Sequence, residues 1–75
     1  MREFNVKEYD NDKSLEVCTR NRRKVRILAT HSRDSESPIV AAITDYDGSE
    51  YMMTFADNGK HTNIQDTPFD LFFKK

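Results

Sequence analysis

The sequence contains a single cysteine, no tryptophan, and only two glycines and two prolines in 75 residues. One thiol, Cys18, cannot form an intrachain disulfide, and chains without disulfides are typical of reducing compartments. A secretory signal needs an apolar stretch near its start, whereas Met1–Ser14 is mostly polar or charged. The longest apolar run, Ile39–Ile43, is far shorter than the roughly 20 residues that span a membrane. These absences predict a soluble cytoplasmic protein that does not contact a membrane.

Charge is nearly balanced overall, with a net value of −1, but it is uneven along the chain. Residues 1–33 carry nine Lys and Arg against five Asp and Glu, and residues 34–75 carry three against eight. Such asymmetry can mark a partner surface. In so short a chain the two halves lie close together, so we expect much of the asymmetry to cancel. The length predicts one domain, residues 1–75, with a stability on the order of a few kcal/mol.

Both glycines lie at hairpin signals. Asp47-Gly48 and Asn58-Gly59 each separate runs that alternate apolar and polar residues, and glycine takes a positive φ without a Cβ clash. Asn21-Arg22 occupies the equivalent place in an earlier alternating run. We therefore predict three hairpins with the same three-residue loop: Arg20-Asn21-Arg22, Tyr46-Asp47-Gly48 and Asp57-Asn58-Gly59. In this arrangement Arg22 must adopt the left-handed conformation that glycine adopts in the other two loops.

The alternation of apolar side chains sets the register within these hairpins, since a slip by one residue would invert the buried face. A three-residue first loop places Val17 opposite Val25, whereas a two-residue loop would place Val17 opposite Arg26. The same rule places Ile43 opposite Tyr51. The predicted core is the inward-facing set Leu15, Val17, Val25, Ile27, Ile39, Ala41, Ile43, Tyr51, Met53 and Phe55.

The predicted fold is a small all-β domain, a four- to five-stranded antiparallel meander that is either open or curled into an SH3-like barrel, with short helical turns at the termini. Strands are expected near residues 15–20, 23–30, 38–45, 49–56 and 60–64. Asn5 and Glu8 have the spacing of a capping box, which predicts a helical turn over Val6–Asp10, although these residues could also extend as a strand. Thr67 and Pro68 precede an aromatic tail, which predicts a second helical turn packed on the sheet.

The only concentrated charge lies in and after the first loop. Its members are Arg20, Arg22, Arg23, Lys24 and Arg26. Grouped cations bind phosphates, and arginine offers two parallel donors for them. Two observations oppose a nucleic-acid site: the pI of 6.1 is well below the value above about 9 typical of such domains, and no aromatic residues alternate with the cluster to stack bases. A solvated strand face that protects a sheet edge is the simpler explanation.

No motif predicts a metal, cofactor or catalytic site. Cys18, His31 and His61 share no short ligand spacing. Asp45 and Asp47 surround a hairpin turn, where aspartate is favoured, and they lack the calcium-loop pattern. No Ser, Cys or Thr lies beside a base in a recognisable arrangement. We therefore expect a protein that is not an enzyme and that uses no cofactor.

The stretch Val17–Leu28 resembles the signature V-C-T-R-D-G-R-x-V-R-I of a family of short uncharacterised proteins from gut Bacteroides genomes and their phages and mobile elements. In that family the signature precedes P-I-V-A-L, a charged hairpin and a D-L-F ending. Pro38–Ala42 and Asp70–Phe72 occupy those places here. The chain departs from the family in having Asn21-Arg22 for D-G and a longer segment before Val17. The resemblance implies a small β domain in a phage or mobile-element setting, and it implies no activity.

Together these patterns favour a non-catalytic binding module that contacts an unknown host or phage protein. The predicted contact surface is the outer face of the sheet, with an apolar centre and a charged rim. Its members are Val40, Ala42, Met52, Glu16, Lys24 and Arg26. The alternative is a nucleic-acid or nucleotide binder that uses the basic hairpin Arg20–Arg26. Phosphate binding weakens steeply between about 50 and 200 mM salt, and an apolar contact does not.

Overall fold

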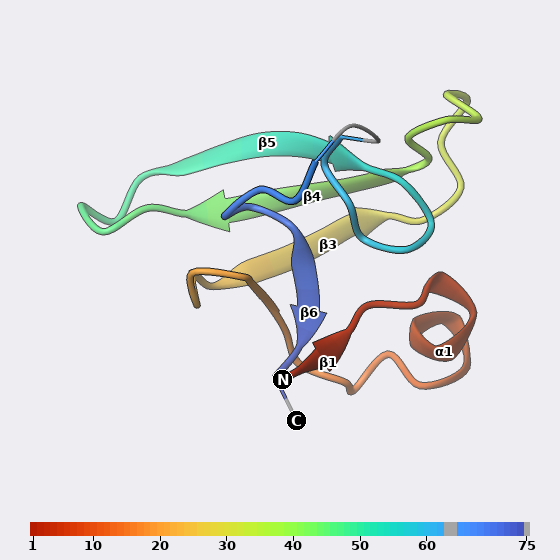
Figure 1. Cartoon of the computed structure of the whole chain (residues 1–75), viewed down its shortest axis with the longest axis horizontal. Coiled ribbons are helices and arrows are strands. Elements are labelled where there is room, and N and C mark those ends of the chain that lie inside the picture. The colour runs from red at the N-terminus through yellow and green to blue at the C-terminus, as the bar shows by residue number, and fades with distance from the viewer. Residues whose placement is uncertain (63–64, 75) are drawn as a thin grey trace.

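The computed structural model describes residues 1–62 and 65–74. The elements of this part are β1 (Arg2–Glu3), α1 (Val6–Asn11), β2 (Val17–Thr19), β3 (Val25–Ala29), β4 (Ile39–Thr44), β5 (Glu50–Phe55) and β6 (Leu71–Phe73). The strands form two antiparallel three-stranded sheets, with the orders β1-β6-β2 and β3-β4-β5. In Figure 1, β6 runs across the direction of β3, β4 and β5. The fold is small and all-β, as predicted, and over the described residues the two sheets do not close into a barrel.

The second sheet contains the three central strands of the predicted meander. β4 and β5 pair with Ile43 opposite Tyr51, which confirms the register expected from the three-residue loop. β3 pairs with the other side of β4, and its register shifts at an irregularity between Ile27 and Ala29. Turn chemistry and side-chain alternation therefore predict this sheet correctly, because every strand pairs with its neighbour along the chain.

The first hairpin keeps the predicted register at its tip but not beyond it. Cys18 lies opposite Lys24, which is the register of a three-residue loop. Val17 and Val25 do not form the predicted strand pair within the described residues. β2 separates from β3 after the hairpin tip, and Val17 pairs with Phe73 instead. The apolar strand β6 thus replaces β3 as the main partner of β2.

The predicted helical turn in the C-terminal tail is wrong. Leu71–Phe73 forms β6, the central strand of the first sheet, between β1 and β2. A reversal precedes this strand, in which the Asp70 N–H donates to the Thr67 carbonyl at 3.3 Å. The first and last residues of β6 are buried and the middle one is half-buried, which is the alternation of a strand and not of a helix.

The N-terminal helical turn is confirmed. α1 follows Asn5, whose Oδ1 accepts a hydrogen bond from the Glu8 N–H at 3.1 Å, so the predicted cap forms. Phe4 is buried immediately before the helix and stacks with Tyr9, with 5.9 Å between ring centroids. This contact is a hydrophobic staple, and it fixes the helix against the core.

The fifth predicted strand, over residues 60–64, is not formed at residues 60–62, and residues 63–64 lie outside the described part. The chain leaves the sheet because the His61 N–H donates to the Asp70 Oδ1 at 3.0 Å instead of to a strand. A side-chain acceptor distant in sequence therefore ends the third hairpin directly after its turn.

The three hairpin loops share one backbone geometry, as predicted. In each, the residue before the loop donates its N–H to the carbonyl of the residue after the loop, and its own carbonyl accepts from the third loop residue. The flanking pairs are Thr19 with Arg23, Asp45 with Ser49, and Ala56 with Lys60. The third loop residue has a positive φ in every case: 66° at Arg22, 89° at Gly48 and 83° at Gly59. Arg22 therefore occupies a conformation that favours glycine.

Replacing Arg22 with glycine should leave stability unchanged or slightly higher. The left-handed conformation costs a residue with a Cβ roughly 1 kcal/mol, and the larger unfolded-state entropy of glycine offsets part of the gain. Gly48→Ala is the matched opposite change, because an added Cβ meets nothing within 4 Å and only backbone strain remains. We expect it to destabilise by about 1 kcal/mol in urea denaturation. A clear loss of stability in Arg22→Gly would show that the side chain, and not the turn, determines this position.

The core lies between the two sheets and contains the predicted residues. Val17, Ile39, Ala41, Ile43 and Phe55 are buried. Leu15, Val25, Ile27, Tyr51 and Met53 pack against them and are half-buried. The first sheet and the chain start add Phe4, Val6, Leu71 and Phe73. Aromatic side chains of the tail therefore cover the meander as expected, although they do so from a strand.

Candidate functional site

The structure divides the predicted basic cluster into internal members, which several groups of the same chain hold, and the remaining members. Arg20 is internal in this sense although 39% of its side chain is exposed: its Nη2 lies 3.1 Å from Oδ2 of Asp70, and its Nε donates to the Thr67 carbonyl at 3.0 Å. Its guanidinium also lies over the Phe72 ring, 4.7 Å from the centroid. The side chain thus connects β2 to the start of β6 and is not directed at a ligand.

Arg23 is the second internal member. Its Nη1 donates to the Tyr51 hydroxyl at 3.0 Å, and its Nη2 lies 3.7 Å from Oδ1 of Asp45. The guanidinium contacts the rings of Tyr46 and Phe69, at 4.8 and 5.3 Å from their centroids. Only 17% of the side chain is exposed. Arg23 therefore holds the first hairpin against the second sheet.

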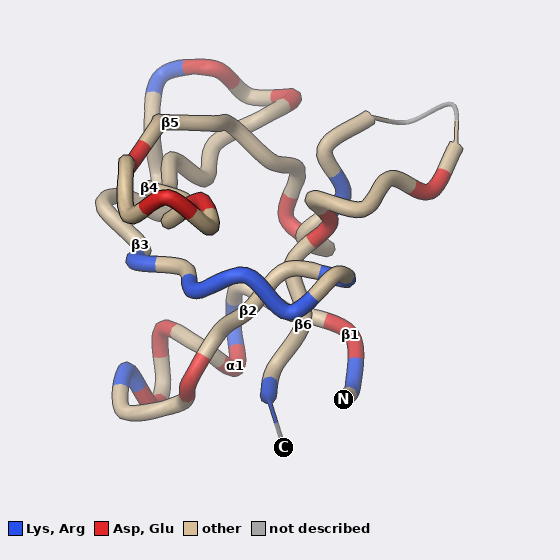
Figure 2. The backbone as a smooth tube through the Cα atoms, turned by 90° about the vertical axis from the view of Figure 1, so that its left-hand side faces the viewer, with Lys and Arg blue, Asp and Glu red and all other residues tan. Residues whose placement is uncertain are grey.

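Arg22, Lys24 and Arg26 are exposed. Arg26 lies 3.1 Å from the Glu50 carboxylate, whereas Arg22 and Lys24 have no ion pair within the described residues. Figure 2 shows the first hairpin as a run of basic positions, with acidic positions of the β4–β5 turn nearby. Ion pairs of Arg20, Arg23 and Arg26 with acidic residues of the second half thus offset part of the uneven charge.

Sequence reasoning missed the buried carboxylate that organises this region. Asp70 accepts hydrogen bonds from the N–H groups of His61 and Thr67 at 3.0 Å, from the Thr67 hydroxyl at 2.8 Å and from Arg20 at 3.1 Å. Its side chain is 3% exposed. Burial raises its pKa, but these hydrogen bonds outweigh burial, and the net effect lowers the pKa. Every donor belongs to the protein, so Asp70 is a structural group.

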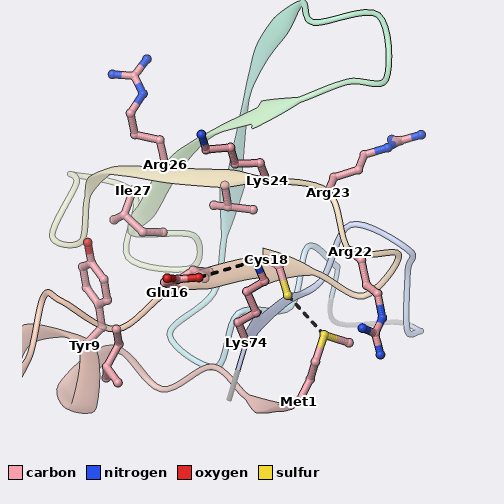
Figure 3. Close-up of a pocket in the computed structure, with 13 residues that line it drawn as sticks. Met1, Tyr9, Glu16, Cys18, Arg22, Arg23, Lys24, Arg26, Ile27 and Lys74 are labelled. Carbon is pink, nitrogen blue, oxygen red and sulfur yellow. Dashed lines mark hydrogen bonds and ion pairs between the residues drawn. The ribbon is translucent and has the colours of Figure 1, made fainter.

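A cleft of about 730 Å³ opens between β2 and β3, where the two strands separate. Its apolar lining comes from Tyr9, Leu15, Val17, Val25 and Ile27. Its basic lining comes from Arg22, Arg23, Lys24, Arg26 and Lys74. In Figure 3, Arg22 and Lys74 lie near Cys18 and Met1 on the β2 side, and Arg26 extends away from the cleft. Four of the five predicted basic residues therefore line one cleft, and Arg20 does not.

Cys18 contributes a thiol to the lining of the cleft. Cys18 is buried, and its Sγ lies 3.2 Å from the Met1 Sδ (Figure 3). Burial raises the pKa of the Cys18 thiol, more than the nearby cations of Lys74 and Arg22 lower it. The thiol is therefore protonated near neutral pH, and the thiolate that attacks electrophiles is scarce.

The outer face of the second sheet holds the predicted apolar residues. Met52 is 72% exposed and Val40 is half-buried. Ala42 was expected to be exposed, but it is only 3% exposed because it lies between Arg26 and Met52 on the neighbouring strands. Leu28, at the irregularity of β3, is 44% exposed and was not predicted. The apolar patch is therefore formed by Met52, Val40 and Leu28.

Within residues 1–62 and 65–74 no group of three or more His, Cys, Asp or Glu side chains is arranged to hold a metal ion. No helix in this part of the chain has the length and apolar character needed to cross a membrane. Comparisons with protein-family models, with curated proteins and with solved structures find no match to this chain. The resemblance to the Bacteroides family stays a prediction from sequence.

Proposed function

We propose that the protein is a small non-catalytic binding module that acts by contact with another protein. The observation that carries this proposal is Met52, whose large apolar side chain is 72% exposed on the outer face of the second sheet. Leu28 and Val40 extend the apolar surface across β3 and β4, and Lys24 and Arg26 supply a charged rim. An exposed apolar patch with a polar border is typical of a protein interface.

The charge distribution supports a protein partner over nucleic acid. Arg20 and Arg23 are engaged with Asp70, Asp45 and aromatic rings of the same chain. Each lost cation removes one phosphate contact and lowers the electrostatic affinity accordingly. The family resemblance implies that the partner is a host or phage protein, encountered inside the cell. A nucleic-acid or nucleotide ligand on the remaining exposed cations is the alternative.

The test is affinity purification of the tagged protein from its native host, with mass spectrometry of the retained proteins. We expect Met52→Glu to reduce the retained partner at least about tenfold, because it places a charge in the apolar centre of the contact. The change should not alter stability, since Met52 is largely exposed. Lys13→Glu, an exposed change outside the patch, is the control and should retain the partner fully.

Two outcomes would contradict the proposal. One is a partner that Met52→Glu and the unmodified protein retain equally. The other is retention that disappears with nuclease treatment or between about 50 and 200 mM salt, which is the behaviour of phosphate binding. That second outcome would favour the alternative function.

A further inference from the structure

β3 presents an unpaired edge to the cleft. The Lys24 carbonyl accepts from the Thr44 N–H at 3.0 Å, so the backbone groups of Lys24 face β4. In an antiparallel ladder the N–H and C=O of successive residues point to opposite sides. The backbone groups of Val25 and Ile27 therefore point away from β4 and toward β2. The antiparallel Cys18–Lys24 bridge places the Val25 N–H on the Val17 carbonyl, so the groups left to the cleft are the Val25 carbonyl and the N–H and C=O of Ile27. Cys18–Lys24 is the one recorded pair between this side of β3 and β2 in the described chain.

β2 presents the opposite edge of the cleft. The Lys74 N–H donates to the Glu16 carbonyl at 2.9 Å, and the Arg20 N–H donates to the Asp70 carbonyl at 2.8 Å. The even-numbered residues of this segment thus face β6, and by the same alternation Val17 faces β3. Two sheet edges therefore confront each other across the cleft, and each leaves backbone groups for another strand.

The cleft is basic at its rim and apolar at its base. Lys24 and Arg26 are exposed on β3, whereas Val25 and Ile27, which alternate with them, are half-buried. Of the described lining residues, Glu16 alone is acidic, and the Lys74 Nζ lies 3.5 Å from its carboxylate. A ligand in the cleft consequently meets cations on its outer side and apolar groups on its inner side.

We propose that the cleft binds an extended acidic segment of a partner protein, which adds as a strand to the free edge of β3. Main-chain hydrogen bonds to the Val25 carbonyl and to the N–H and C=O of Ile27 supply affinity, as in other cases of strand addition. Alternate side chains of a strand point to opposite faces. The bound segment therefore alternates apolar residues over Val25 and Ile27 with acidic residues on the face that carries Lys24.

Strand addition also joins the two separate sheets. A segment seated between β2 and β3 lies next to both free edges and makes one continuous sheet of the two. The cleft is a second binding site, distinct from the outer-face contact proposed above. The two sites can be tested separately because Met52 does not line the cleft.

The probe is a fluorescein-labelled, end-capped peptide of seven residues that alternates glutamate and valine, titrated at about 50 mM salt with fluorescence anisotropy. We expect saturable binding, together with a downfield NMR shift of the Ile27 amide proton. The same peptide with lysine in place of glutamate should not bind. A version N-methylated at alternate amides keeps the charge but cannot form the ladder, and it should bind at least about tenfold more weakly.

The matched variants locate the site. The double change Arg22→Glu with Lys24→Glu should weaken peptide binding at least about tenfold, because both side chains are exposed and line the cleft. Lys7→Glu with Arg33→Glu makes the same charge change outside the cleft and should leave binding unchanged. Met52→Glu should also leave it unchanged, which separates this site from the outer-face contact.

Four results would each overturn the proposal. They are no saturable binding of the acidic peptide, equal binding of the N-methylated peptide, equal effects of the two double changes, and tighter binding of a seven-residue oligothymidine than of the peptide. The last result would identify the cleft as a phosphate-binding site. If peptide binding to the cleft fails but the partner is still retained through Met52, the proposed binding function stands and only the strand-binding role of the cleft is wrong.

Discussion

Replacing Asp70 with asparagine is expected to destabilise the protein by about 3 kcal/mol. The buried carboxylate accepts two backbone N–H groups, a hydroxyl and a guanidinium, and hydrogen bonds to a charged group contribute roughly 1.5–3 kcal/mol each. An amide in this place directs its own N–H toward these donors and leaves the Arg20 charge without its buried partner. Urea denaturation at pH 7 measures the loss as a lower midpoint. Because the whole domain has only a few kcal/mol to lose, a large unfolded fraction is expected.

Asp66→Asn is the matched control for Asp70→Asn. Asp66 also pairs with Arg20 and with Lys60, but its side chain is 61% exposed, so solvent replaces the lost contacts. We expect its urea midpoint to stay close to that of the unmodified protein. An equal loss in both variants would mean that general charge balance, and not the buried acceptor, stabilises this corner.

The effect of Asp70 should depend on pH in a defined direction. Its pKa is lowered in the folded protein, so its stabilisation is present above the unfolded-state pKa of about 3.9 and is lost as the pH falls through the folded value. The difference in stability between the unmodified protein and Asp70→Asn should therefore narrow below about pH 4. A stability difference that stays constant from pH 7 to strongly acidic solution would show that Asp70 is not ionised in the folded protein.

Phe73→Ala should destabilise by about 3–5 kcal/mol, which is the usual cost of removing a buried phenylalanine side chain. Phe73 is 1% exposed, stacks on Phe4 with 5.2 Å between centroids, and has the guanidinium of Arg2 4.6 Å from its own centroid. The substitution leaves a cavity in the first sheet at its central strand. Thermal unfolding followed by circular dichroism should show a protein that is largely unfolded at room temperature.

Phe72→Ala is the control on the same strand. Phe72 is half-buried and the guanidinium of Arg20 lies over its ring, so we expect less than half the destabilisation of Phe73→Ala. Deleting residues 69–75 removes β6 entirely and should abolish the cooperative transition. An unchanged melting temperature after that deletion would contradict the central position of this strand.

The parts of the fold that sequence predicted correctly are those made by neighbours along the chain. The loops before Arg23, Ser49 and Lys60 follow from turn chemistry, and the β4–β5 register follows from side-chain alternation. β6 could not be predicted in this way. Leu71–Phe73 is too short to reveal a period, the preceding Thr-Pro pair is also a helix signal, and both partner strands lie far away in sequence.

The candidate site was predictable only in its composition. The sequence identified the basic residues, but nothing local indicates that Arg20 and Arg23 pair with carboxylates of the same chain, because their partners Asp70 and Asp45 come from distant segments. The cleft was missed for a related reason. The sequence predicted an uninterrupted pairing of β2 with β3. The edge of β3 becomes free only because β2 pairs with β6 instead. The Thr67-to-Asp70 spacing, a local turn, was the one available signal for the buried carboxylate.

The placement of β6 between β1 and β2 also constrains the order in which the chain folds. β3, β4 and β5 close through short loops and can pair as soon as they are synthesised, whereas β1 waits for a partner almost a whole chain length away. Loop closure of that span is entropically costly and slow relative to hairpin formation. On the ribosome the meander can therefore be complete while β1 and β2 are still unpaired. β6, which is synthesised after both of its partners, then joins them, so the first sheet forms by the insertion of a central strand rather than the addition of an edge.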